Sequence, residues 1–128
     1  MGLVRYMAKE VLKEIGNRSR EFYEFVLPPV DMYLDGDDLI VTIDMAGFDK
    51  KGIKLRIKGN ILSINAKRED EYDGTMIWRQ RPQVIDKKIR LPADIKEGEE
   101  EISSAKFSQG VITLKIPIKH TGKDINIE

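Results

Sequence analysis

Apolar and polar residues alternate along Ala105–Ile118, and this alternation restricts the fold more than any other feature of the sequence. Side chains of a β-strand point to opposite faces at every second residue, so the pattern predicts strands with one buried face. The pair Gln109-Gly110 interrupts the pattern, which is typical of a tight turn between antiparallel strands. Pro117 is expected to end the second strand, because proline has no N–H to donate to a central ladder. The stretch therefore predicts a hairpin.

Similar alternation recurs along much of the chain. The segments that show it are Val30–Tyr33, Leu39–Met45, Ile53–Lys58, Leu62–Ala66 and Val84–Leu91. Turn signals separate the segments, and Gly59-Asn60 marks the least ambiguous hairpin. Seven or eight short strands without an internal helix predict an all-β, antiparallel β-sandwich.

The first 27 residues have a different pattern. Apolar residues recur every four positions at Leu3, Met7, Val11 and Ile15, which predicts an amphipathic helix of about four turns. Gly16-Asn17 is expected to end this helix, and an aromatic cluster with Phe22 and Phe25 follows. The segment could pack on its own domain. We favour an arm that docks on other subunits or on foreign apolar surface, because the rest of the chain reads as a complete β-domain.

Pro28-Pro29 marks the boundary of the arm, since successive prolines block a helix. The expected organisation is an arm over residues 1–27, a β-domain over 28–118 and an extension over 119–128. In that extension Ile125 and Ile127 stand in an otherwise polar terminus, with no core of their own. They could pack back on their own domain, or fit a strand surface of the sandwich.

The alternation fails between Arg68 and Pro82. A loop of this length inside a compact domain is usually functional or disordered. Its apolar tip, Met76-Ile77-Trp78, suggests a short strand that pairs elsewhere, with Trp78 as an ordinary core residue the alternative. Lys87 shares the parity of the apolar residues in Val84–Leu91, so a charge is expected on the apolar face.

Composition restricts the function. Lys and Arg together number 22, as do Asp and Glu, and the absence of a basic excess argues against nucleic acid as the main partner. The absence of cysteine excludes disulfides and Cys-ligated zinc. No signal-like or membrane-spanning apolar run occurs, so cytoplasm is the expected compartment. A charged fraction of 34% points towards a heat-adapted chain.

Catalytic and metal-binding motifs are missing. His120 is the only histidine, which leaves little scope for a His-centred triad or metal cluster, and a solvated surface role is expected for it. The acidic residues near Asp35–Asp38 lack calcium-loop spacing and are interpreted as a hydrated turn, and those at Glu97–Glu101 as a solvated loop. No catalytic, cofactor or metal site is predicted, and an enzyme is not expected.

Taken together, several short motifs resemble those of small heat shock proteins, closely those of archaea. The motifs are Pro29–Tyr33, Asp44–Phe48, Ile89–Pro92, the Ala105–Leu114 signature and the terminal I-x-I sequence of Ile125 and Ile127. The resemblance covers Pro28–Glu128. It implies an α-crystallin domain, which is an immunoglobulin-like sandwich. It also implies an ATP-independent holdase that works as an oligomer of dimers on partly unfolded client proteins.

The resemblance further implies two assembly contacts. The Arg68–Pro82 loop would carry a strand that inserts into a partner's sheet, so the dimer residues would be Met76, Ile77, Trp78 and Lys87. The tail motif would dock in a groove of another dimer, with Leu55, Ile57, Ile112 and Leu114 as contacts. Lys87 stands where many members have arginine, which keeps the charge but loses the bidentate fork. An alternative is an adaptor or co-chaperone of the p23 type, which lacks the tail motif and the dimerising loop.

Overall fold

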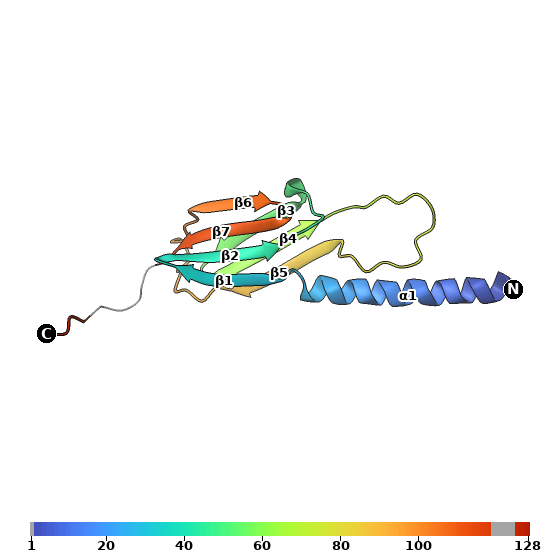
Figure 1. Ribbon diagram of the computed structural model, residues 1–128, viewed down its shortest axis with the longest axis horizontal. Coiled ribbons are helices and arrows are strands. Elements are labelled where there is room, and N and C mark those ends of the chain that lie inside the picture. Colours follow the sequence, from blue (N-terminus) through green and yellow to red (C-terminus); the bar gives the residue numbers. More distant parts are fainter. Residues whose placement is uncertain (1, 119–124) are drawn as a thin grey trace.

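The computed structural model describes the backbone of residues 2–118 and 125–128, and the side chains of that range from residue 8 onward. A helix, α1 (Gly2–Val26), precedes the strands (Figure 1). The strands are β1 (Val30–Asp35), β2 (Asp38–Asp44), β3 (Ile53–Lys58), β4 (Ile61–Lys67), β5 (Val84–Arg90), β6 (Ser104–Ser108) and β7 (Val111–Pro117), with a short 3-10 helix, η1 (Lys50–Gly52), before β3. The predicted all-β class, with an N-terminal helix, is confirmed.

The strands form two antiparallel sheets that face each other. One sheet has the strand order β1-β2-β7-β6 and the other has the order β3-β4-β5. The hairpin predicted at Ala105–Ile118 is confirmed, with Phe107 opposite Ile112. Its turn residues Gln109 and Gly110 have φ angles of 51° and 78°, the pair of positive values that a type I′ turn requires. This turn matches the right-handed twist of the strands.

The core lies between the two sheets and consists of the alternating residues. Its buried side chains are Leu39, Val41, Ile43, Met45, Phe48, Leu62, Ile64, Ala66, Ile85, Leu91, Ile112, Leu114 and Ile116. Full burial of one such aliphatic side chain contributes roughly 1.5–3 kcal/mol. No polar or charged residue of the described part is buried in this core. The apolar core of the sandwich is therefore complete without any residue of α1.

Helix α1 is longer than the sequence predicted. The expected end at Gly16-Asn17 is wrong, because the helix continues without a break to Val26. A glycine inside a helix costs only about 1 kcal/mol relative to alanine, so it weakens the helix without ending it. The helix ends at Val26, close before Pro28 and Pro29, which cannot continue it.

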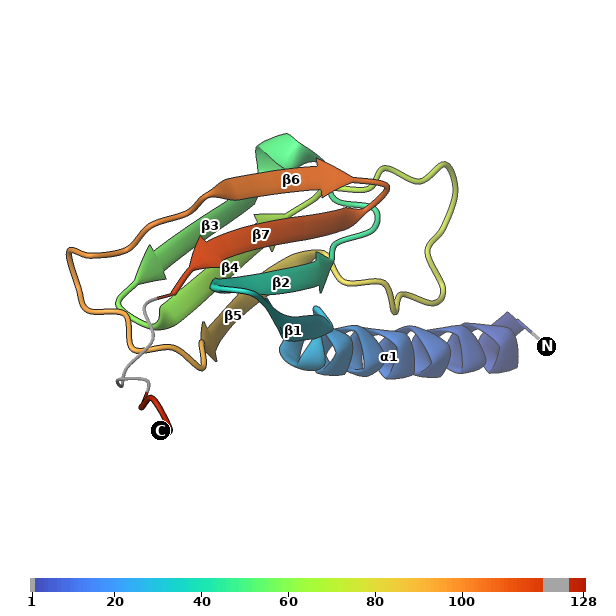
Figure 2. The ribbon, with the colours of Figure 1, turned by 60° about the vertical axis from the view of Figure 1, so that its left-hand side comes forward.

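The segment from residue 68 to 83 runs as a long loop beside α1 (Figures 1 and 2). Residues 69–83 contain no strand, so the strand suggested by Met76-Ile77-Trp78 does not form within a single chain. Trp78 is 43% exposed, and the alternative that made it a core residue is wrong. Among the described residues, no helix combines the length and the apolar character needed to cross a membrane.

Candidate functional site

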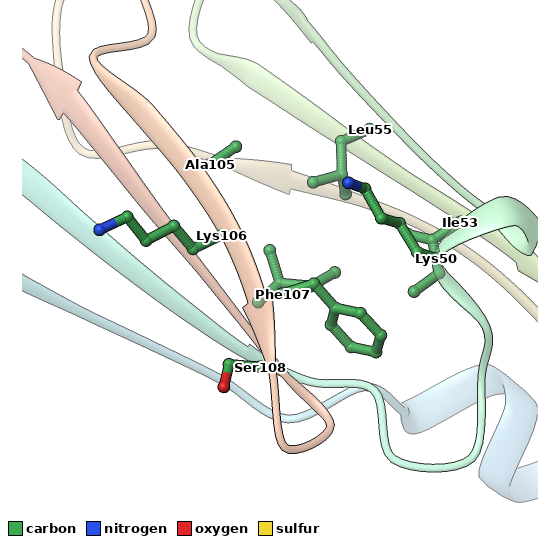
Figure 3. Close-up of a pocket in the computed structure, with 8 residues that line it drawn as sticks. Lys50, Ile53, Leu55, Ala105, Lys106, Phe107 and Ser108 are labelled. Atoms are coloured by element: carbon green, nitrogen blue, oxygen red, sulfur yellow. The ribbon is translucent and has the colours of Figure 1, made fainter.

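An apolar groove opens where the edges of the two sheets meet. Strand β6 is the edge of the four-stranded sheet and β3 is an edge of the three-stranded sheet. The groove between them has a volume of about 590 Å³ and is lined by Lys50, Ile53, Leu55, Ala105, Lys106, Phe107, Ser108 and Ile112. Figure 3 shows the ring of Phe107 directed into this space, towards Ile53. The groove can therefore accept apolar side chains.

Only two of the four residues predicted to form a tail-binding groove line it in the structure. Leu55 lines one wall and Ile112 is part of the lining. Leu114 is 2% exposed and belongs to the core between the sheets, because β7 is an interior strand and this side chain lies on its buried face. Ile57 is half-buried against the core and does not line the groove. The sequence did not single out Phe107, which lines the groove and directs its ring into it.

The chemistry of the groove is apolar in the middle and basic at the rim. Lys50 of η1 and Lys106 of β6 both border the groove, and the ammonium of Lys106 points away from it (Figure 3). Because side chains alternate along β6, Ala105 and Phe107 lie on the face of the groove, whereas Lys106 and Ser108 point away from that face. An extended peptide with apolar side chains two residues apart and acidic flanks would complement such a site.

The tail isoleucines lie outside the core. Ile125 is 86% exposed and Ile127 is 96% exposed, so the alternative in which they pack back on their own domain is wrong for this structure. The linking residues 119–124, and with them His120, lie outside the described residues.

The long loop is fixed at its base by Arg68. The guanidinium Nε of Arg68 donates a hydrogen bond of 2.7 Å to the carbonyl oxygen of Pro82, and the group lies 4.8 Å from the ring centroid of Phe48. Gln83 donates to Asp70, and this bond, together with the nearby Arg68, holds the pKa of Asp70 below its ordinary value. In the sequence, Arg68 marks only the start of a loop. No local pattern reveals its contacts with Phe48 and Pro82, because these residues are 20 and 14 positions away in the chain.

Two side chains, Glu24 and Lys87, connect the end of α1 and the residues after it to β5 and to the residue before β5. The carboxylate Oε1 of Glu24 accepts hydrogen bonds from the backbone N–H of Gln83 (2.7 Å) and of Val84 (3.2 Å). The ammonium of Lys87 donates to the carbonyl oxygens of Val26 (3.1 Å) and Pro28 (3.2 Å). The expected charge on the apolar parity of β5 is therefore present, and it binds the carboxyl end of α1.

Gly16 brings the middle of α1 against the loop. A Cβ at this position would lie 2.7 Å from the backbone nitrogen of Arg79 and 3.3 Å from the Cα of Trp78. A side chain could therefore be accommodated only if the backbone of the loop or the helix shifted. The glycine that sequence analysis took for a helix end is a close-approach position, and neither Gly16 nor Glu24 had been singled out as a contact.

The aromatic and aliphatic residues predicted for the arm are left in water. Val11, Ile15, Phe22 and Phe25 are all exposed, with Phe25 at 84%. The side chains of Leu3 and Met7 lie outside the described residues. The arm thus touches its own domain with polar groups while its described apolar residues remain free.

The acidic loop before β6 contains a further backbone contact. Glu100 accepts hydrogen bonds from the N–H of Gly59 (2.6 Å) and of Gly98 (2.9 Å). These contacts, the one from Gly59 above all, hold the pKa of Glu100 below its ordinary value. The loop residue thereby clamps the β3–β4 turn.

Comparisons with known proteins agree on one family. Residues 31–128 match the profile of the Hsp20/alpha crystallin family. The chain is 30% identical over 98 residues to an 18 kDa heat shock protein of Streptomyces albus G, covering 74% of this chain and 67% of that protein. It is also similar to the solved structure of the Del-C4 mutant of hsp14.1 from Sulfolobus solfatataricus P2. Here the identity is 46% and the TM-score is 0.71, over 79% of this chain and 83% of that one.

Proposed function

Because this chain belongs to the Hsp20/alpha crystallin family, whose members are ATP-independent chaperones and not enzymes, we propose that it is a holdase for partly unfolded proteins. The observation that carries this proposal is the apolar surface that the chain leaves in water around a complete core. Phe22 and Phe25 on α1 are exposed, and so are both tail isoleucines. Exposed apolar surface is unfavourable by about 25 cal/mol per Å², so subunits or clients should cover it.

Members of this family form oligomers, and for this chain we propose dimers joined by their tails. The tail carries Ile125 and Ile127 between Asp124 and Glu128 in the sequence. The groove between β3 and β6 supplies apolar walls and a rim with Lys50 and Lys106. Both spacing and charge therefore suit docking of the tail of one copy into the groove of another.

For the dimer contact we propose the 68–82 loop. Its tip residues Met76, Ile77 and Trp78 form no strand in the single chain. Strand β1 lies at the edge of the four-stranded sheet, and its outer edge offers unpaired N–H and C=O groups. A tip segment from a second copy could add to such an edge as a further strand. The conversion from loop to strand would then follow from pairing.

The experiment that tests the holdase proposal follows light scattering of a heat-labile enzyme, without nucleotide, at equal concentrations of enzyme and chaperone subunits. The full chain should suppress aggregation. A chain truncated before Pro28 should lose most of this protection, because it lacks the exposed apolar residues of α1, yet keep the sandwich folded, because the core does not include α1. No suppression by the full chain would contradict the proposal, and full suppression by the truncated chain would remove the arm from it.

A further inference from the structure

Helix α1 has two distinct faces. The face turned to the rest of the chain contains Lys13, Gly16, Arg20 and Glu24, which are buried or half-buried. These residues are three or four positions apart, so they share one side of the helix. Gly16 meets the backbone of Arg79, and Glu24 accepts from the N–H groups of Gln83 and Val84. The helix is thus docked through a polar face, and its orientation relative to the loop is fixed.

The opposite face is a regular seam that is apolar except for Arg18. Its members, all exposed, are Ala8, Val11, Ile15, Arg18, Phe22 and Phe25. Successive members are separated by three, four, three, four and three residues, which is the spacing of the a and d positions of a coiled coil. Exposed fractions of 54% for Val11 and 60% for Phe22 show that this seam has no partner within the described chain. The helix extends beyond the sandwich in both views (Figures 1 and 2), so a second helix has room to approach.

The seam has a gradient of side-chain size. Its N-terminal half carries the small residues Ala8 and Val11, and its C-terminal half carries Phe22 and Phe25. A parallel pair of such helices would place large rings against large rings and small residues against small ones, and it would bring Arg18 against its own copy. Like charges at facing positions are unfavourable, and uneven packing leaves voids.

An antiparallel pair removes both problems. Ala8 then faces Phe25 of the second helix and Val11 faces Phe22, so small residues meet large ones at every end of the seam. Arg18 then faces Ile15 and no longer its own copy, from which it is offset by three residues along the helix. It keeps the ion pair with Glu14 of its own helix, at 2.9 Å, and comes near the second Glu14. The seam is therefore complementary to itself in one direction only.

We propose that the outward face of α1 pairs in antiparallel fashion with α1 of a second copy of this chain. The contact is isologous, with a two-fold axis near the middle of the helix, and is therefore closed. It extends the role in assembly proposed above for the arm. Because Gly16 and Glu24 hold each helix on its own 68–83 loop, the pairing would also set the orientation of the two loops. A client has no reason to match the size gradient, and for this reason the second copy is the occupant we infer.

Cysteine cross-linking tests this pairing, because the natural chain has no cysteine. Two single variants, Val11→Cys and Phe22→Cys, are prepared in the full chain and co-expressed with different tags. The two positions are 11 residues apart, about 16 Å along one helix, so they cannot react within a chain. After mild oxidation, the antiparallel seam predicts a cross-linked pair carrying both tags, at least several-fold more abundant than pairs carrying one. Predominant pairs of two Val11→Cys chains would show a parallel seam and overturn the proposal.

The matched control is Glu10→Cys with Glu21→Cys, which has the same 11-residue spacing on exposed positions away from the seam. Cross-linking that does not exceed this control would also overturn the pairing. Each sample is assayed in parallel for suppression of aggregation. If aggregation is suppressed but the seam cross-links are absent, the holdase function is supported and the pairing is rejected. The exposed face of α1 would then be assigned to client binding. Seam cross-links without suppression support the pairing and reject the function.

Discussion

The ammonium nitrogen of Lys87 lies 3.1 Å from the carbonyl oxygen of Val26, the last residue of α1. A helix exposes unpaired carbonyl groups and a partial negative charge at its carboxyl end, and a lysine on the neighbouring strand satisfies both. The family resemblance of the sequence implies a role for Lys87 beside the dimer loop. Within the single chain, its protons are directed to the junction between the arm and the sandwich, and the arm is thereby tied to β5.

Replacing Lys87 with methionine should loosen this junction. The aliphatic stem is retained and the charge is lost, so α1 should lose about 0.3–1 kcal/mol of stability, the usual contribution of a cation at a helix carboxyl end. Amide hydrogen exchange over residues 22–27 should accelerate while the unfolding midpoint of the sandwich stays unchanged. Lys88→Met is the matched control, because Lys88 is exposed on the opposite parity of β5. Equal exchange in both variants would contradict the assigned contact.

A leucine in place of Gly16 should release α1 from the loop. The added Cβ would meet the backbone of Arg79 at 2.7 Å, although the substitution favours helix formation by roughly 0.5–1 kcal/mol. The amides of Gln83 and Val84, which donate to Glu24, should exchange roughly tenfold faster, as expected for losing a hydrogen bond to a charged group of about 1.5 kcal/mol. Asn17→Leu, at an exposed neighbouring position, should leave these amides protected. Protection retained in Gly16→Leu would show that the helix tolerates a side chain at this contact.

Glu100 predicts an effect of pH on the stability of the β3–β4 turn. Because hydrogen bonds from Gly59 and Gly98 lower its pKa in the folded protein, the charged form is favoured by folding. This contribution is fully present above the ordinary value of 4.5 and is lost as the pH falls through the folded-state pKa. Glu100→Gln should therefore be less stable than the natural chain at pH 7 and equal to it in strong acid. Chemical unfolding at both pH values measures this, with the exposed Glu99→Gln as control, and a difference that persists in acid would exclude ionisation as its cause.

Substitutions in the tail and in the groove should have the same effect on assembly. Burial of Ile125 and Ile127 would contribute roughly 1.5–3 kcal/mol each, against about 1–2 kcal/mol for every link residue that docking orders. One tail would bind weakly, and several in a closed assembly would bind cooperatively. Either Ile125→Ala with Ile127→Ala or Leu55→Lys should reduce the particle to dimers in sedimentation, without changing the unfolding of the sandwich. The control, Asn126→Ala, should still form the large particle. If the isoleucine variant also forms it, a contact other than the tail must hold the assembly together.

Removal of the loop tip should separate the dimer. Deletion of residues 70–78 takes away no core residue, so the sandwich should remain folded. Sedimentation of a variant that combines this deletion with truncation before Pro28 and the two isoleucine substitutions should show a monomer, because the seam of α1 and the tail contact are then removed as well. A dimer in this variant would mean that the loop does not make the dimer contact.

Alternation in the sequence determined the strands, their turns and their buried faces. The period of two at Leu39–Met45 and the Gln109-Gly110 pair act within a few residues, so no distant information was needed to predict them. The motifs from Pro29 to Ile127 also identified the family in advance of the structure. The apolar character of the arm and of the tail could be read in the same way.

Tertiary structure alone decided which residues each surface contains. Leu114 alternates like Leu55, but it lies on β7, an interior strand between β2 and β6, whereas Leu55 lies on the edge strand β3. The order in which strands pair is set by contacts between segments far apart in the chain. In the sequence, Gly16 resembles the end of a helix. In the structure, the backbone of Arg79, more than sixty residues away, occupies the space that a Cβ at this position would take. Lys87 and Val26 are likewise brought together by the packing of α1 against β5. A local pattern reports the geometry of its own segment, whereas these contacts depend on which segments the fold places side by side.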